Sequence, residues 1–413
     1  MRGPGITCAA ASSAVRILQL CNKPPYPPID GGCKAMHGLT MGLIDNGHQV
    51  KVLCIATPKH PFDRSAMPAD YLERTGIEGI FTDTSLNIVD AFTDLVTADN
   101  YNISRFFSPD MDIRLIRLLS AEAFDVVLLE SLFMTPYIAT IRRYTKAPIV
   151  LRSHNLEHVI QERIAHGERH PLKKPYRRFL ARQLKAYEIA VLDRVDGVAA
   201  ITPADADHFK AYGKKAPIAT IPFGVDPAAY AIDPPSGPPV FFHLGSMDWL
   251  PNEEGIRWLI ERVWPEVLKR HPDARLHLAG NRMPEDLLAL RMPGLTVEGR
   301  VPDADAYMAT RHVMVVPLHS AGGMRVKIIE GMAMGKCVIS TPMGAEGIAC
   351  TDGHDILLAD SAAEMVARMC QVLDAPERCA AIGRNARELV ERAYNNALIT
   401  RELDAFMRSL CAR

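Results

Sequence analysis

The 413 residues exceed what one compact core usually holds, so the length predicts two domains, and 48% hydrophobic with 23% charged residues is the composition of an ordinary globular protein. The formal net charge of −1 provides no general attraction to nucleic acid or membrane, and we expect no nucleic-acid partner. Nine cysteines without a Cys-x-x-Cys pair favour a reducing cytoplasm over a disulfide scaffold. No apolar run is long enough to span a bilayer.

The chain begins with a predicted disordered tail, residues 1–14, which lacks the pattern of a signal peptide. Val15 to Cys21 is predicted as a buried strand, and a helix is expected from about Cys33 to Asn46. Gly31 and Gly32 precede that helix, where free N–H groups can bind an anion, although a plain strand–helix connection explains them equally well. The G-x-G-x-x-G fingerprint is absent, which argues against a nicotinamide enzyme.

Strands and helices then alternate, after a stretch from Thr57 to Asp110 whose elements the pattern does not place. Phe124 to Glu130 and Ala147 to Arg152 are predicted strands separated by helices, an order that indicates a parallel sheet with ligands at the carboxyl ends of its strands. Glu130 and His154 lie at two such ends.

The segment His154 to His158 has the H-x-x-E-H pattern of some zinc peptidases. His154 directly follows a strand, and Asn155 is predicted as the N-cap of the next helix, so the two histidines would not share a helical face. A histidine hydrogen-bonded at a strand end is the plainer interpretation. Two Asp-x-Asp pairs, Asp205 with Asp207 and Asp303 with Asp305, fall in first turns of helices, where carboxylates are favourable, so we predict no metal site.

An amphipathic basic region follows from His158 to Leu192. A solvated helical face explains it, and attraction to anionic lipid headgroups is the alternative. Its basic residues are Arg163, Arg169, Lys173, Lys174, Arg177, Arg178, Arg182 and Lys185.

The second half repeats the alternation after a proline-rich linker, Asp233 to Pro239. Val240 to Leu244 is predicted as its first strand, followed by a loop from Gly245 to Asn252 and a helix. The final helix is expected at about Asn396 to Leu410.

The most informative stretch is Val313 to Thr341, in which a buried strand, a small-residue loop and a helix from Met324 to Met334 succeed one another. Loop N–H groups and the positive end of the helix dipole form an anion site in this arrangement. Arg325 and Lys327 are predicted in the first turn, against the dipole, which indicates an anionic ligand.

This stretch resembles the donor loop of glycosyltransferase family 4, whose signature is two glutamates separated by seven residues, followed by Ala-Met-Ala-x-Gly. Glu330 and the residues up to Gly335 match the second half, whereas Gly322 stands in place of the first glutamate. A branch of the family carries Gly-Gly-x-Arg-x-Lys here, as this chain does from Gly322 to Lys327. The missing glutamate removes the usual contact with the donor sugar.

The resemblance implies an α/β fold of two Rossmann-like lobes, the GT-B architecture, with a C-terminal helix crossing back to the first lobe. The expected parts are an acceptor-side lobe at 15–222, a hinge and linker at 223–239, a nucleotide-sugar lobe at 240–393 and the returning helix at 394–413. It also implies that His154, Arg325, Lys327 and Glu330 perform the catalysis. The donor would contact Gly31, Gly32, Ser246, Asn252, Arg300, Gly322, Gly323 and Met324.

The resemblance further implies a retaining glycosyltransferase that moves a sugar from a nucleoside diphosphate to a hydroxyl of an acceptor glycan or lipid-linked glycan, in cell-surface polysaccharide synthesis. No cofactor and no metal are expected, because two fixed cations can replace a metal ion. We expect a cytoplasmic protein with peripheral contact to the anionic inner face of the plasma membrane. Two alternatives remain: a sugar-nucleotide epimerase or hydrolase on the same fold, and a non-catalytic nucleotide- or glycan-binding protein.

Overall fold

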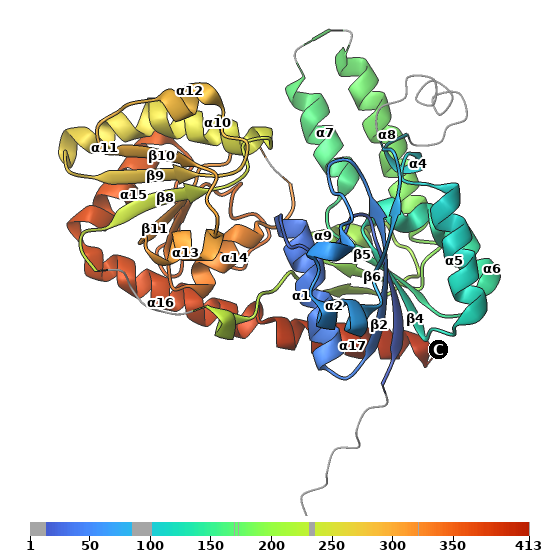
Figure 1. Cartoon of the computed structure of the whole chain (residues 1–413). Helices are drawn as coiled ribbons and strands as arrows, with labels where there is room; N and C mark the ends of the chain where they lie inside the picture. The colour runs from blue at the N-terminus through green and yellow to red at the C-terminus, as the bar shows by residue number, and fades with distance from the viewer. Residues whose placement is uncertain are drawn as a thin grey trace, which may run out of the picture.

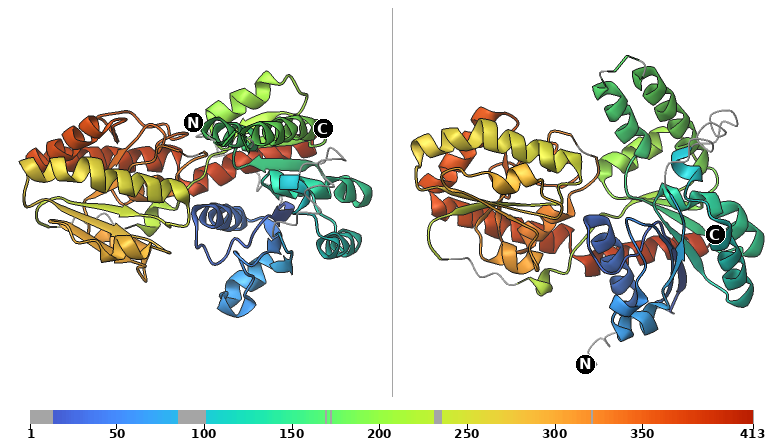
Figure 2. Two further views of the ribbon diagram at one scale, coloured as in Figure 1. Left: turned by 90° about the horizontal axis from the view of Figure 1, so that it is seen from above. Right: turned by 45° about the horizontal axis from the view of Figure 1, so that its top comes forward.

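The computed structural model describes residues 14–84, 101–168, 170–171, 173–230, 236–320 and 322–412. Two parallel sheets stand side by side, each with helices on both faces, so the predicted two-lobed α/β fold is confirmed (Figures 1 and 2). The strand orders are β3-β2-β1-β4-β5-β6-β7 and β10-β9-β8-β11-β12-β13, so both sheets begin in the middle and turn outward in the same way.

The N-terminal lobe contains the first sheet. Its strands are β1 (Arg16–Cys21), β2 (Gln49–Ala56), β3 (Glu78–Phe81), β4 (Val126–Glu130), β5 (Ile149–Ser153), β6 (Gly197–Ala200) and β7 (Ile218–Thr220). Its helices are α1 (Gly31–Asp45), α2 (Ala69–Thr75), α4 (Tyr101–Ser104), α5 (Pro109–Ala121), α6 (Ile138–Tyr144), α7 (Glu157–Gly167), α8 (Lys173–Val191) and α9 (Pro203–Ala211), with 3-10 turns η1 (Arg64–Ala66) and η2 (Leu132–Tyr137).

The C-terminal lobe contains the second sheet. Its strands are β8 (Val240–Leu244), β9 (Arg275–Ala279), β10 (Leu295–Gly299), β11 (Val313–Val316), β12 (Cys337–Ser340) and β13 (Leu357–Leu358). Its helices are α10 (Leu250–Trp258), η4 (Leu259–Val263, a π-turn), α11 (Trp264–Arg270), α12 (Glu285–Ala289), α13 (Ala304–Ala309), α14 (Val326–Ala333), α15 (Ala362–Asp374) and α16 (Pro376–Ala393), and a 3-10 turn, η3 (Pro227–Ala229), lies between the lobes.

The central strands are buried along their whole length, because helices cover both faces of each sheet. Every residue of β4, β11 and β12 is buried, and apart from the terminal Glu130 and Ser340 these strands are apolar. A parallel sheet requires such continuous apolar strands, so its polar side chains gather where the strands end. Those ends face the boundary between the lobes.

Three helix starts differ from the prediction. Helix α1 begins at Gly31, two residues early, because Asp30 is its N-cap and accepts a hydrogen bond from Cys33 N at 2.8 Å. Helix α14 begins at Val326, so Arg325 has extended backbone and precedes the helix. The prediction of Asn155 as an N-cap was wrong: Leu156 occupies that position without a side-chain cap.

The basic region forms two antiparallel helices, α7 and α8, which project from the N-terminal lobe as a hairpin (Figures 1 and 2). The base of the hairpin lies beside the C-terminal lobe, and its far end is free of both sheets (Figure 1). Arg169, one of the predicted basic residues, lies outside the described residues.

Helix α17 (Asn396–Cys411) leaves the C-terminal lobe and packs against α1 of the other lobe, as predicted (Figure 1). Asn396 donates a side-chain hydrogen bond to Gly38 O, and Asn46 donates one to Thr400 Oγ1 at 3.0 Å. Gly42 lies so close to Thr400 that a Cβ would be 2.6 Å from its Cγ2.

The chain crosses between the lobes twice, and the two crossings lie together. Val225 N donates to Tyr394 O at 2.9 Å, and Asn396 N donates to Val225 O at 2.8 Å. The last strand of the first sheet ends at Thr220, and β8 begins at Val240. Residues 1–13 of the predicted tail and 231–235 of the predicted linker lie outside the described part of the chain.

Candidate active site

The ends of β4 and β5 place three ionisable side chains in one buried cluster. Glu130 Oε2 accepts hydrogen bonds from Arg152 Nη1 at 3.2 Å and from the ring of His154 at 2.6 Å, while Gln19 Nε2 donates to Glu130 Oε1 at 2.8 Å. The Arg152 guanidinium also lies 4.7 Å from the ring centre of Phe223. Each charge of this cluster therefore has a partner.

These contacts decide the protonation of the cluster. Burial opposes ionisation of Glu130, but the charge of Arg152 and the hydrogen bonds from His154 and Gln19 outweigh it and hold the pKa of Glu130 at about 2. Burial lowers the pKa of His154, against the attraction of Glu130. A neutral His154 therefore donates its Nε2–H to an ionised Glu130, which leaves Nδ1 as a hydrogen-bond acceptor.

Two cations face this cluster from the start of α14. Lys327 Nζ donates to Asn252 Oδ1 at 2.9 Å and Leu244 O at 3.3 Å, and it lies 3.5 Å from His243 Nε2. Arg325 donates two hydrogen bonds to Gly323 O, and its guanidinium lies 5.1 Å from a ring centre of Trp249. Within the described part of the chain, neither cation forms an ion pair with a carboxylate.

Both cations are held in a state that disfavours their charge. Burial and the neighbouring charge of Arg325 lower the pKa of Lys327 to about 7. Burial lowers the pKa of Arg325 to about 10, although the more distant Glu346 attracts it. An anion bound between them would stabilise both charged forms, so the site has the electrostatics of an anion-binding site.

Glu330 joins the lobes at the next turn of α14. Its Oε1 accepts a hydrogen bond from Lys34 Nζ of α1 at 2.5 Å. Burial raises the pKa of Glu330, and the charge of Lys34 opposes that rise. Lys34 therefore holds one oxygen of the Glu330 carboxylate from across the lobe boundary.

The first residues of α1 and α14 meet across the lobe boundary. A Cβ on Gly31 would lie 3.4 Å from Val326 Cβ, which is an ordinary van der Waals distance, so the two helix N-termini lie close together. A Cβ on Gly32 would lie 2.9 Å from Lys23 Nζ. The predicted donor contacts Gly31 and Gly32 thus lie in the first turn of α1, beside the beginning of α14.

The loop before α14 is pressed against α7. Gly323 has a φ of +75°, and a Cβ there would lie 2.0 Å from Asn155 Oδ1. A Cβ on Gly322 would lie 2.5 Å from Ile160 Cγ1. Met324, the third predicted donor contact of this loop, is buried in a hydrophobic cluster of mainly C-terminal residues.

The remaining predicted donor contacts lie at different distances from the cations. Asn252 is buried, accepts from Lys327, and donates to Ser246 O at 2.8 Å. Ser246 Oγ donates to Asp248 Oδ1 at 2.6 Å, which turns the hydroxyl toward the mouth of the site. Arg300 is exposed after the edge strand β10, and the structure does not bring it to the cations.

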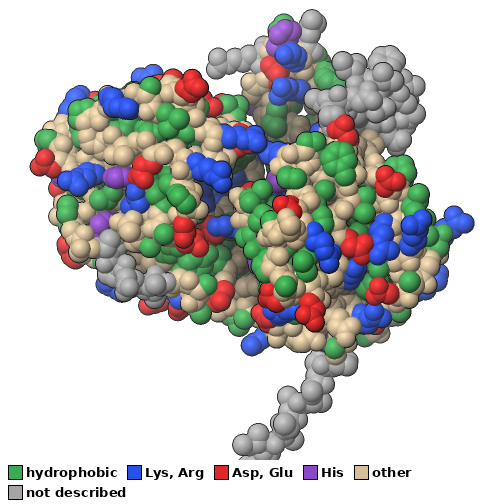
Figure 3. Space-filling model, viewed as in Figure 1, with side chains coloured by type: hydrophobic (Ala, Val, Ile, Leu, Met, Phe, Trp, Pro, Cys, Tyr) green, Lys and Arg blue, Asp and Glu red, His purple; other side chains and the backbone are tan. Residues whose placement is uncertain are grey.

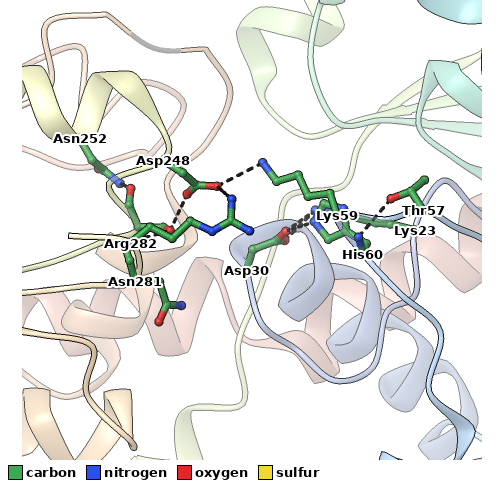
Figure 4. A network of polar contacts seen from close by, with 10 residues as sticks. Lys23, Asp30, Thr57, Lys59, His60, Asp248, Asn252, Asn281 and Arg282 are labelled. Atoms are coloured by element: carbon green, nitrogen blue, oxygen red, sulfur yellow. Dashed lines mark hydrogen bonds and ion pairs between the residues drawn. The ribbon is translucent and has the colours of Figure 1, made fainter. Parts of the chain in front are cut away.

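A polar network spans the mouth of the site (Figure 4). Lys59 of the N-terminal lobe lies 3.5 Å from Asp248 of the other lobe, which Arg282 also approaches at 3.3 Å. Behind Lys59, Asp30 pairs with Lys23 at 2.7 Å and His60 at 3.0 Å. Lys and Arg side chains gather in the hollow where the lobes meet on this face (Figure 3).

His158 does not join His154. Its Nδ1 lies 2.5 Å from Glu188 Oε2, and its Nε2 lies 3.0 Å from Tyr212 Oη, so both ring nitrogens are taken inside the N-terminal lobe. The described residues contain no cluster of three or more histidine, cysteine, aspartate or glutamate side chains that could hold a metal ion. This geometry disfavours the zinc-peptidase interpretation.

A surface hollow of about 430 Å³ lies elsewhere on the C-terminal lobe, beside β13 and α15. Its polar groups are paired with one another: Arg368 donates to Asp352 at 2.7 Å, and Glu364 accepts from Ser361 N as part of the cap of α15. We place no site there, because the unpaired cations and the strand ends lie at the lobe boundary.

Sequence reasoning missed several residues of the site. Asp30 carried a signal, since an aspartate before two glycines is a typical N-cap. Lys34 carried none, because it is one of many lysines and its partner Glu330 lies 296 positions away.

Two family models match the chain, one on each lobe. The glycosyltransferase family 4 model matches residues 29–229, and the glycosyl transferases group 1 model matches residues 238–375. A curated relative, an uncharacterised 44.6 kDa protein in the cps region of Klebsiella pneumoniae, is 23% identical over 126 residues, which are 28% of this chain and 32% of that protein. This match spans about a third of the relative's length.

Solved structures share the whole fold. A sucrose-phosphate synthase from Thermosynechococcus elongatus has a TM-score of 0.67 at 15% identity, over 96% of this chain and 99% of its own. HepE of Anabaena, solved with UDP-glucose, has a TM-score of 0.64 at 14% identity, over 96% and 100%. An α,α-trehalose 6-phosphate synthase from Burkholderia multivorans has a TM-score of 0.63 at 15% identity, over 96% and 99%. The chain belongs to the two-lobed glycosyltransferases of the family 4 and group 1 type.

Proposed function

We propose that this protein transfers a sugar from a nucleoside-diphosphate donor to a hydroxyl of an acceptor glycan or lipid-linked glycan, with retention of anomeric configuration and without a metal ion. The observation that carries the proposal is the pair of buried, carboxylate-free cations, Arg325 and Lys327, at a loop and helix N-terminus between the lobes. The family membership of the chain supports it.

The cations suit a diphosphate leaving group. When the glycosidic bond of the donor breaks, negative charge grows on the departing phosphate, and preorganised cations lower the barrier by stabilising that charge. Lys327 and Arg325 are held in place by Asn252 and Gly323 O before any ligand arrives. They can take the role that a divalent metal plays elsewhere.

His154 faces the reaction from the opposite lobe. Because its Nε2–H is committed to Glu130, the free Nδ1 is an acceptor for a hydroxyl of the sugar or the acceptor. Glu130 is buried and doubly paired, so it orients the imidazole and is not a nucleophile. In the proposed reaction the departing phosphate takes the acceptor's proton on the same face of the sugar, which gives retention.

The first test is a thermal-shift panel of UDP, GDP, ADP and TDP on wild type and Arg325→Ala, with and without chelator. A ligand at a hundred times its dissociation constant stabilises the folded state by about 2.7 kcal/mol. We expect one nucleotide to stabilise the wild type with or without chelator, and the variant not to respond. No response to any nucleotide, or a response that chelator abolishes, contradicts the proposed donor site or its metal independence.

Turnover then separates the alternative functions. We expect the bound nucleotide sugar to be consumed only when a glycan acceptor is added. Consumption without an acceptor indicates an epimerase or hydrolase, and binding without consumption by any acceptor indicates a non-catalytic protein.

We also propose that the α7–α8 hairpin contacts an anionic membrane surface, which would bring a lipid-linked acceptor to the site. Lys173, Arg178 and Arg182 are exposed on α8 next to the exposed rings of Tyr176 and Phe179. None of the described helices has both the length and the apolar character to cross a bilayer. Sedimentation with phosphatidylglycerol vesicles, but not with phosphatidylcholine vesicles, and its loss in Arg178→Glu/Arg182→Glu, is the expected result.

A further inference from the structure

The donor loop lacks the glutamate that relatives use, and the N-terminal lobe occupies the vacated side. A side chain at Gly322 would run into Ile160 of α7, since a Cβ there would lie only 2.5 Å from Ile160 Cγ1. A glutamate at this position is therefore incompatible with the closed arrangement of the lobes. The recognition that this glutamate would supply has to come from another residue, or be absent.

Asn155, which lies just before α7, packs against the same loop and is hydrogen-bonded to Glu157, the first residue of the helix. Asn155 Oδ1 lies against Gly323, which can adopt its φ of +75° and admit the amide because it has no Cβ. Asn155 Nδ2 donates to Glu157 Oε1 at 3.1 Å. The amide and the carboxyl thus form a hydrogen-bonded pair, one and three residues after His154, with the amide against the loop.

Glu157 differs from three other glutamates near the lobe boundary. Glu130 pairs with Arg152, Glu330 with Lys34, and Glu346 with Arg163, whereas no described cation pairs with Glu157. Its hydrogen-bond partner is the neutral Asn155. Burial raises the pKa of Glu157 to about 7, with Asn155 opposing and the charge of Glu188 adding to the rise. A half-buried carboxyl without a cation is costly unless a ligand uses it.

We propose that Asn155 and Glu157 recognise hydroxyls of the donor sugar in place of the missing loop glutamate, so that sugar specificity comes from the N-terminal lobe. The proposal rests on the assignment of the donor site to the loop before α14. A carboxyl oxygen accepts two hydroxyl hydrogen bonds, and an amide can donate and accept, which matches the vicinal hydroxyls of a hexose. A consequence is that these residues contact the sugar hydroxyls only when the lobes are closed.

A purely structural role of Glu157 makes a different prediction. It lies at the first position of α7, where a carboxylate also stabilises the helix through its dipole. Loss of that effect would lower stability and weaken every ligand equally. Loss of sugar recognition would weaken binding of the nucleotide sugar and leave binding of the bare nucleotide unchanged.

The experiment compares dissociation constants of the preferred nucleoside diphosphate and of its glucose, galactose, N-acetylglucosamine and glucuronate conjugates, by calorimetry. In wild type we expect one conjugate to bind more tightly than the rest. In Glu157→Gln we expect the nucleoside diphosphate to bind within about twofold of wild type and the preferred conjugate to bind about 10- to 100-fold more weakly. Glu162→Gln, on the same helix with an exposed side chain paired to Lys185, is the matched control and should change neither.

Equal weakening of nucleotide and conjugate, or no change in either, overturns the inference while the donor site stands. If wild type binds no nucleoside diphosphate, the donor site and the inference fail together. Should Glu157→Gln unfold, Asn155→Ala provides the same comparison, because it removes the amide without touching α7. Its expected result is again a selective loss of the conjugate.

Discussion

The two sides of the site, called walls here, differ in how their buried charges are paired. On the N-terminal side, Glu130 is surrounded by Arg152 and His154, so a buried charge is fully partnered. On the C-terminal side, Arg325 and Lys327 are buried without a carboxylate among the described residues. Every charge of the first wall therefore has a partner of opposite charge, whereas the cations of the second wall have none among the described residues.

From this difference we infer that the N-terminal wall orients His154 and that the C-terminal wall binds the proposed ligand. A partnered cluster stabilises only while all its members remain, and its value is the orientation of His154. Unpartnered cations reduce the stability of the empty protein and return that free energy when the ligand binds. Mutations on the two walls should therefore move stability in different directions.

The largest effect is expected from Arg152→Met. The substitution leaves Glu130 buried without its strongest partner, and breaking such a pair typically lowers the free energy of unfolding by about 3–5 kcal/mol. Urea denaturation at pH 7 measures it. The double variant Glu130→Gln/Arg152→Met should recover part of the loss, and a double variant less stable than the single one would contradict a paired cluster.

The next effect concerns the opposite wall. Lys327→Met should leave the unfolding free energy of the empty protein unchanged or higher, because it removes an unpaired buried charge. The stabilisation by the preferred nucleoside diphosphate, about 2.7 kcal/mol at a hundred times its dissociation constant, should vanish. Lys269→Met, an exposed lysine paired with Glu266 on the same lobe, serves as control for loss of a positive charge.

Lys327 and Glu130 should change the free energy of unfolding in different pH ranges, each by about 1.4 kcal/mol per pH unit. The pKa of Lys327 falls from 10.5 to about 7, so its cost to stability is full below pH 7 and is relieved as pH rises from 7 to 10.5. The pKa of Glu130 falls from 4.5 to about 2, so its contribution is present above pH 4.5 and is lost as pH falls to 2. Between pH 8 and 9 the wild type should therefore gain stability relative to Lys327→Met, as measured by urea denaturation at each pH.

The smallest effect is expected at the rim, where the walls touch. Arg163 and Glu346 form a two-pronged ion pair at 2.6 and 2.9 Å between the lobes, but their side chains are 42% and 38% exposed. Exposed pairs contribute below about 1 kcal/mol. Glu346→Gln should change the unfolding free energy by less than that and increase the open population in small-angle scattering; a large loss of stability would show that the rim holds the lobes together.

The sequence predicts the parts of each wall better than their contacts. Strand ends, the glycine loop and the cations Arg325 and Lys327 follow from local pattern, because strand burial and helix dipoles act over a few residues. The pairing of Glu130 with Arg152 and His154 depends on the order of strands in the sheet, which alternation alone does not provide.

Asn155 shows the limit most clearly. An asparagine before a helix is a good local cap, but the Asn155 amide donates to Glu157 Oε1, and its oxygen lies against Gly323 of the other lobe. Lys34 and Glu330 are similar, since neither lobe alone reveals their ion pair.

The two chain crossings pair at Val225 and Asn395, so the lobes are joined along a single hinge line. Two bodies joined along one line keep an easy rotation about that line and resist sliding past one another. Displacement in such a rotation grows with distance from the hinge line, and α7 lies on the opposite side of the molecule from α17 (Figure 1). A few degrees of opening would therefore separate Asn155 from Gly323 while the nucleotide stays bound to the C-terminal lobe. A donor could then bind before the N-terminal lobe contacts its sugar.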